Sequence, residues 1–220
     1  MKKINSVKAS SNLHESGFSL IELLIAIAIV GIVFAGIYSI FFTSNRTYIT
    51  QEEIVDAQQR ARISLEFMTR DIRMAGLDPI GNAEDTVDGD GAGFKKATAS
   101  EMRFTMDLDM NGGIDTSNSI VGRILNEERV SYALVGSELM RGVYENTDDE
   151  RWDIIIDGIR SLAFSYEDAA GTVIPLPVSV NNLNRIRVIN IRLICDFRDA
   201  QGAIFTRTLS TTVTCRNPVE

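Results

Sequence analysis

The chain has 220 residues, of which 45% are apolar, and its formal net charge is −8 at pH 7. This length suffices for one globular head and an anchoring segment. The acidic balance disfavours nonspecific binding of nucleic acid, because neutralising phosphates requires clustered Lys and Arg.

The residue types that most enzymes use are scarce. The only histidine is His14, so nucleophilic and zinc sites that need imidazole are excluded from the rest of the chain. Two cysteines alone cannot form a thiolate zinc site. Carboxylate-only catalysis stays open in principle, but no pair of acids stands out, so we predict a protein that is not an enzyme.

Residues 17–42 form an apolar run that is interrupted by one charge, Glu22. A helix over 18–42, at about 1.5 Å per residue, is longer than the ~30 Å hydrocarbon core of a bilayer. A carboxylate in such a segment costs about 2.5–3.5 kcal/mol even on lenient insertion scales, so it marks a site that needs a partner. An ordinary signal peptide has a shorter apolar core, and neither it nor a simple anchor explains Glu22.

Lysines precede the apolar run at Lys2, Lys3 and Lys8. Positive charge on this side of a span favours retention in the cytoplasm, which would place residue 43 onward across the membrane.

Apolar residues recur at three- and four-residue steps in the charged segment that follows, which predicts a helix with one buried face. These residues are Ile54, Ala57, Ala61, Leu65, Met68 and Ile72. No Gly or Pro lies between Gly36 and Gly76, so the apolar helix should continue unbroken to about Ala75. Gly76 is the expected C-terminal cap, and Pro79 prevents continuation.

Residues 77–100 are rich in Gly, Asp and Ala, and they predict a long loop. Short segments with strand character follow, with clear alternation in 162–166 and 189–197. We expect strands over 101–107, 129–135, 138–141, 154–156, 160–166, 185–197 and 203–215. Hairpin turns are expected at 136–137 and 200–202. One long helix followed by an antiparallel sheet is an α+β arrangement.

The start of the apolar run joins a small residue, an aromatic residue and one acid at fixed spacing, behind a short basic leader. Gly17, Phe18, Ser19, Leu20, Ile21 and Glu22 form this motif. It resembles the N-terminus of type IV pilins and pseudopilins. The resemblance implies the pilin fold, cleavage by prepilin peptidase after Gly17, and N-methylation of Phe18.

Weaker motifs downstream are similar to those of PilW-type minor pilins and of J-type pseudopilins of type II secretion. They include Asp71-Ile-Arg-Met-Ala-Gly76, Phe104-Thr-Met-Asp-Leu-Asp109 and Leu162-Ala-Phe-Ser-Tyr166, together with Tyr132-Ala-Leu134, Leu139-Met-Arg141 and Arg216-Asn217. The implied organisation is a cleaved leader (1–17), a membrane-spanning half-helix (18–42), its amphipathic continuation (43–76) and a β-rich head (77–220).

The resemblance implies a minor pilin that helps to initiate or cap a type IV pilus. Its expected partners are prepilin peptidase, other major and minor pilins through the N-terminal helix, and the inner-membrane assembly platform. It would first cross the bacterial inner membrane once, with its head in the periplasm, and later join a filament at the cell surface. A J-type pseudopilin is the alternative, and a single-pass anchored binding protein or enzyme is the second.

Glu22 has two interpretations. Its carboxylate could pair with the methylated α-amine of Phe18 on a neighbouring subunit, so that the charge is neutralised only on assembly in the correct register. In the other interpretation the side chain reaches the membrane surface and has no role.

A short acidic segment has oxygen-bearing side chains at alternate positions, followed by glycine, as calcium loops do. The candidate ligands are Asp107, Asp109, Asn111 and Asp115. Asn118 stands where a calcium loop would have a bidentate Glu, and no flanking helix is evident. Calcium binding and an ordinary acidic turn are therefore both open, and no other cofactor is expected.

Cys195 and Cys215 would lie in an oxidising compartment, where a disulfide is the first expectation. If the last two strands form a hairpin around Gln201, however, Cys215 faces residues 185–187, far from Cys195. A disulfide tolerates a Cα separation of only about 4.4–6.8 Å. The pairing would therefore require the last strand to bend or to pair elsewhere.

Overall fold

The computed structural model describes residues 17–89, 91–117, 120–121, 124–125, 127–198 and 202–217. Most of the expected leader, the Asn118 position and most of the expected 200–202 turn lie outside these residues. The chain divides into two compact units, Met1–Ile49 and Thr50–Glu220.

Helix α1 spans Leu20–Met74 without interruption, which confirms the predicted long helix. It ends where the sequence indicates, because Gly76 adopts a φ of 73°, a left-handed conformation that glycine enters without steric cost. The N–H of Gly76 then donates to the carbonyl of Thr105 at 3.0 Å, which joins the end of the helix to the first long strand of the head.

In the first unit, every described residue of 17–49 is exposed. Among the described residues, one helix, α1, is long and apolar enough to cross a membrane, and none of its apolar window is buried. A helix that is apolar on all sides is stable when lipid or other protein surrounds it.

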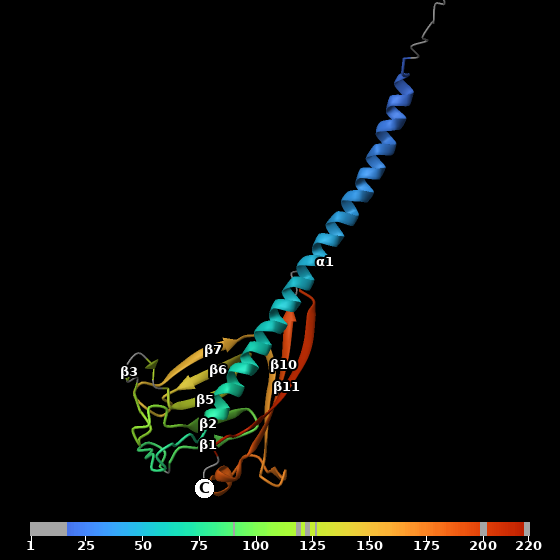
Figure 1. Cartoon of the computed structure of the whole chain (residues 1–220). Coiled ribbons are helices and arrows are strands. Elements are labelled where there is room, and N and C mark those ends of the chain that lie inside the picture. Colours follow the sequence, from blue (N-terminus) through green and yellow to red (C-terminus); the bar gives the residue numbers. More distant parts are fainter. Residues whose placement is uncertain are drawn as a thin grey trace, which may run out of the picture. The chain divides into compact units, whose positions relative to one another are not determined.

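In the second unit, α1 buries one stripe against the head. The buried residues are Ala57, Ala61, Ser64, Leu65, Met68 and Ile72. They match the predicted stripe except that Ile54 is half-buried and Ser64 is added. The buried Ser64 hydroxyl finds its hydrogen-bond partner within the helix, because it donates to the Arg60 carbonyl at 2.9 Å. Figure 1 shows this part of α1 running along the strands of the head.

The first sheet is antiparallel, with strand order β1-β2-β5-β6-β7. Its strands are β1 (Phe94–Ala97), β2 (Glu101–Thr105), β5 (Arg129–Val135), β6 (Glu138–Val143) and β7 (Arg151–Ile156). The β5–β6 hairpin turns at Gly136 and Ser137, as predicted, and Gly136 has a φ of 62°.

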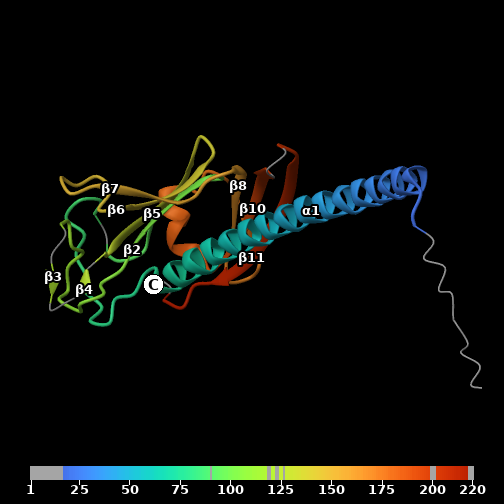
Figure 2. The same ribbon diagram turned by 90° about the horizontal axis from the view of Figure 1, so that it is seen from above.

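The second sheet is also antiparallel, with order β11-β10-β8-β9. Its strands are β8 (Ile159–Glu167), β9 (Val173–Ile174), β10 (Val188–Arg198) and β11 (Ile204–Thr214). A 3₁₀ helix, η1 (Val180–Arg185), precedes β10, and β3 (Ile120–Val121) pairs with β4 (Ile124–Leu125). In Figures 1 and 2 the two larger sheets lie side by side along the second half of α1.

One hydrophobic core joins the α1 stripe to both larger sheets. Its large, fully buried side chains include Met68, Phe104, Tyr132, Tyr166 and Ile189. The observed class is α+β, a long helix on antiparallel sheets, and it is consistent with the expected pilin fold.

The predicted loop at 77–100 is wrong in its last part, where β1 forms. The residues just before this strand are rich in glycine, so the sequence predicts a loop there. In the structure Phe94 packs edge-on against Phe104, with ring centroids 6.0 Å apart. Pairing with β2 therefore stabilises a strand whose local sequence does not predict it.

Candidate functional site

The start of α1 places the conspicuous acid, Glu22, beside its own helix terminus. Glu22 Oε2 accepts a hydrogen bond from the Ser19 N–H at 2.9 Å, and Ser19 Oγ accepts one from the Glu22 N–H at 3.3 Å. This reciprocal pair is a capping box, which satisfies two main-chain donors that the helix leaves unpaired. The Ser-x-x-Glu spacing was visible in the sequence, but neither interpretation of Glu22 drawn from the sequence included a cap.

Phe18 lies two residues before the start of α1, and 88% of its surface is exposed. Glu22 is exposed as well, so its carboxylate can cap its own helix and still meet a cation from outside the chain.

In the head, three carboxylates converge at the turn that follows β2. Asp107, Asp109 and Glu128 each offer an oxygen, and these oxygens all lie within 4.8 Å of one another. Asp107 and Glu128 are fully buried. Carboxylate oxygens at this spacing are the donor set that a hard cation such as Ca²⁺ prefers.

Main-chain N–H groups fix these carboxylates. Glu128 Oε1 accepts from the N–H of Leu108 at 2.7 Å, and its Oε2 accepts from the N–H of Asp115 at 2.9 Å. Asp107 Oδ1 and Oδ2 accept from Asn111 and Gly112 at 3.2 and 3.0 Å. Burial raises the pKa of Glu128, and the hydrogen bonds from Asp115, Asp109 and Leu108 oppose this rise.

The predicted ligand set is therefore partly brought together. Asp107 and Asp109 are in the cluster, whereas the side chain of Asn111 donates to Asp109 Oδ2 at 3.0 Å. Asp115 contributes a main-chain N–H to Glu128. Sequence reasoning missed Glu128, because it reaches the turn from the start of β5, more than a dozen residues beyond the loop motif.

The two cysteines are unbonded and buried. Cys195 lies opposite Arg207 in the β10–β11 register, while the N–H of Cys215 donates to the Arg187 carbonyl at 2.8 Å. Eight residues separate Cys195 from Arg187, which is roughly 26 Å along a strand. The expected disulfide is therefore corrected: the last strand pairs regularly and keeps the thiols far apart. Burial raises the pKa of each thiol to about 11.

A mostly buried polar network attaches α1 to the first sheet. Asp71 Oδ2 accepts hydrogen bonds from the Tyr132 hydroxyl at 2.7 Å and from Arg141 Nε at 2.9 Å. Arg141 Nη1 also donates to Glu127 at 2.6 Å. Burial and the Asp71 charge raise the pKa of Tyr132 well above its usual value, so this hydroxyl stays protonated and donates.

A second network lies under β1 and β5. The fully buried Arg129 donates to both oxygens of Asp85 at 2.8 Å and to Asp88 at 2.8 Å. Arg103 adds a contact to Asp88 at 3.4 Å. These ion pairs neutralise one another inside the head.

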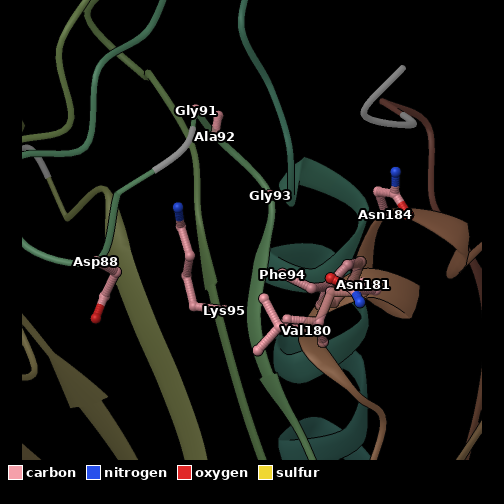
Figure 3. A pocket seen from close by; sticks show the side chains of 10 residues that line it. Asp88, Gly91, Ala92, Gly93, Phe94, Lys95, Val180, Asn181 and Asn184 are labelled. Carbon is pink, nitrogen blue, oxygen red and sulfur yellow. The ribbon is translucent and has the colours of Figure 1, made fainter.

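A cavity of about 640 Å³ opens beside this network, between β1 and η1. Asp88 and Lys95 line one side, and Phe94, Asn181 and Asn184 lie across the cavity from them (Figure 3).

Comparison with known proteins gives a match for the N-terminal segment. Residues 12–38 match the prokaryotic N-terminal methylation motif. A comparison with curated proteins finds no match to the chain. Together with the exposed apolar half of α1, the motif suggests membrane anchoring and implies processing by prepilin peptidase. The chain thus carries, over residues 12–38, the N-terminal signature of a type IV pilin-like prepilin.

Proposed function

We propose that this protein is a minor pilin of the PilW type, which helps to initiate or cap a type IV pilus and has no catalytic activity. One observation carries the proposal: α1 has 30 residues before Thr50 whose apolar side chains are all exposed, and a single acid, Glu22, lies in its first turn. Such a surface requires lipid first and neighbouring helices afterwards.

The role proposed for Glu22 is assembly through charge. After cleavage following Gly17, the methylated amine of Phe18 on one subunit would pair with Glu22 of the next. A pair that forms only in one register would set the axial position of each subunit. Partners would be other pilins along this helix and the inner-membrane assembly platform, with the head in the periplasm before assembly.

Intact-mass analysis of the membrane-extracted protein tests the processing step. A mature chain that begins at N-methylated Phe18 supports the proposal. A chain that keeps residues 1–17 in a host with active prepilin peptidase contradicts it and favours the second alternative, a single-pass anchored binding protein or enzyme.

Glu22→Gln tests the charge separately from the cap. Glutamine can accept the same hydrogen bond from the Ser19 N–H as glutamate does, but it carries no charge. We expect Glu22→Gln to lower incorporation into filaments about as strongly as Glu22→Ala. If Glu22→Gln assembles normally while Glu22→Ala fails, capping explains the residue and the pairing role is wrong.

A J-type pseudopilin of type II secretion has the same N-terminal chemistry and is the alternative. Deleting the gene for this chain in its own host distinguishes the two functions. Loss of surface pili supports a minor pilin, and loss of protein secretion supports a pseudopilin.

We also propose that the turn after β2 binds calcium. The convergence of Asp107, Asp109 and Glu128 within 4.8 Å supports this, since Glu128 supplies the acid that the loop motif lacks at Asn118. Extracellular calcium sites commonly have Kd values of about 10⁻⁴–10⁻³ M, so the titration needs millimolar calcium. Thermal melts in calcium and in chelator should differ, and the difference should vanish when Asp107 and Asp109 are both replaced by alanine.

A further inference from the structure

The cavity between β1 and η1 belongs to neither the N-terminal motif nor the acidic turn. Its volume of about 640 Å³ falls within the roughly 300–1,000 Å³ that small-molecule sites occupy. Figure 3 shows Lys95 on one wall, and Phe94, Val180 and Asn181 grouped across the cavity from it.

The η1 wall carries two side-chain amides that have no hydrogen-bond partner in the described structure. Asn181 and Asn184 line the cavity, both are exposed, and neither side chain has a hydrogen bond among the described residues. They are three positions apart in a 3₁₀ helix, in which residues i and i+3 lie on the same side. Each carboxamide offers two donors and one acceptor oxygen to a ligand.

The η1 wall is held firmly in place. Leu183 is buried in the head core, and its carbonyl accepts from the Ile186 N–H at 3.2 Å. The Val178 N–H donates to the Ala97 carbonyl of β1 at 2.9 Å, just before η1 begins. The backbone that carries the two amides is therefore held in place, which lowers the entropic cost of binding.

The charged groups of the opposite wall are already neutralised. Lys95 Nζ lies 3.3 Å from Asp85 and also contacts the Gly89 carbonyl. Asp88 is paired with Arg129 and Arg103. Because the cations face carboxylates of the protein, the wall offers an anionic ligand little net attraction, and it still offers polar atoms for hydrogen bonds.

Apolar surface completes the lining. Phe94 and Leu183 contribute apolar surface to the cavity, and Val180 stands at its rim with 74% of its surface exposed. A ligand that suits these walls needs apolar C–H groups for Phe94 and Val180, and hydroxyl or amide groups for the two asparagines. A pyranose ring combines both.

We propose that this cavity binds a neutral saccharide. An extended peptide fits less well, because peptides that bind beside strands use free main-chain groups. Here both main-chain groups of Gly93 are paired with Thr105, at 3.2 and 2.8 Å, and the Ala97 carbonyl is taken by Val178.

Ligand-observed saturation-transfer NMR tests the proposal on the full chain. The protein is purified in lauryldimethylamine oxide, because detergents with sugar headgroups would compete. The probes are lactose, cellobiose, maltose and N,N′-diacetylchitobiose. We expect saturation transfer to at least one of them, and affinity at least tenfold lower in a variant with Asn181→Ala and Asn184→Ala, whose side chains are exposed and have no hydrogen bond among the described residues.

Asn182→Ala is the matched control. Asn182 belongs to the same helix, but its side-chain oxygen accepts from Arg185 Nη1 at 3.4 Å and it does not line the cavity. Its affinity should equal that of the wild type. Val180→Trp, which fills the rim, should abolish binding without changing either asparagine.

Three results would overturn the proposal. The first is saturation transfer to none of the four sugars. The second is a signal that survives both the double asparagine variant and Val180→Trp. The third is tighter binding of sialyllactose than of lactose, which would make the site one for anions. Binding here does not depend on filament assembly, so the minor-pilin proposal stands or falls separately.

Discussion

In α1, the apolar residues of 20–49 are exposed on every side of the helix, whereas those of Thr50 onward that recur at three- and four-residue steps are buried in the head. One continuous helix therefore meets two different requirements. A stripe can be satisfied by one sheet face, but a helix that is apolar all round needs surroundings on every side. The first half depends on lipid or on other subunits, and the second half is complete within the chain.

The largest expected effect tests how firmly the second half is attached. Asp71→Ala leaves Arg141 and Tyr132, both mostly buried, without their shared acceptor. Breaking a buried ion pair costs about 3–5 kcal/mol, and because Arg141 keeps its contact with Glu127 at 2.6 Å, we expect a loss near the lower end of that range. Denaturant unfolding of the full chain should show a loss of about this size in the free energy of unfolding of the head.

The control for Asp71 is an exposed aspartate on the same helix, Asp56. Asp56 pairs with Arg60 at 3.4 Å, with more than half of each side chain exposed. Asp56→Ala should change the free energy of unfolding by about 0–1 kcal/mol. Equal losses for the two variants would mean that the network around Asp71 does not anchor the helix.

The next prediction compares two isoleucines, one in each half. Ile72 is fully buried, and Ile29 is exposed. Ile72→Ala should destabilise the head by about 2–5 kcal/mol, since it removes buried apolar atoms and leaves a cavity. Ile29→Ala should leave the unfolding transition of the head unchanged, and any loss there beyond experimental error would show that the first half contributes to head stability.

The acidic turn gives a smaller effect that depends on solution conditions. At a hundredfold excess of calcium over Kd, binding should stabilise the head by about 2.7 kcal/mol, provided that the unfolded chain does not bind. Glu128→Gln should remove most of this gain, because it deletes a charged ligand. A full calcium response in Glu128→Gln would exclude Glu128 from the site.

In chelator, the same residue predicts a dependence on pH. Burial raises the folded-state pKa of Glu128 above its usual 4.5, so the folded head holds this proton more tightly than the unfolded chain does. Its contribution to stability is present below the unfolded-state pKa and is lost as pH rises through the folded-state pKa. The difference in unfolding free energy between wild type and Glu128→Gln, measured from pH 4 upward, should fall accordingly. A constant difference would contradict the raised pKa.

The smallest effect concerns the start of α1. Ser19→Ala removes the hydroxyl that accepts from the Glu22 N–H, and loss of such a cap costs about 1 kcal/mol locally. Hydrogen exchange at the Glu22 amide should accelerate, while the melting temperature of the head stays constant. Ser39→Ala, in the middle of the helix, should change neither the exchange of the Glu22 amide nor the melting temperature of the head. A fall in the head's melting temperature with Ser19→Ala would argue against two independent regions.

Features that arise from neighbouring residues were predictable. The ends of α1, its buried stripe and the β5–β6 turn each depend on residues within a few positions, such as Gly76 and Gly136, whose left-handed backbone conformations the turns require. The major strands were also expected, because alternation along each strand reflects which face is buried. The Ser19–Glu22 capping box was equally local, and its spacing could have been recognised.

Features that join distant segments were not predictable in the same way. The amino-acid sequence by itself determined the long helix, the N-terminal motif, and the β-rich character of the head, because helix and strand periodicity and capping are short-range properties. Only the tertiary structure decided that Glu128 joins Asp107, that β1 forms beside β2, that Cys195 and Cys215 stay apart, and that Asn181 and Asn184 share a cavity with Phe94. Each of these depends on how β1, β5, β10, β11 and η1 are brought together by one shared core, and no short window of sequence contains both partners of such a contact.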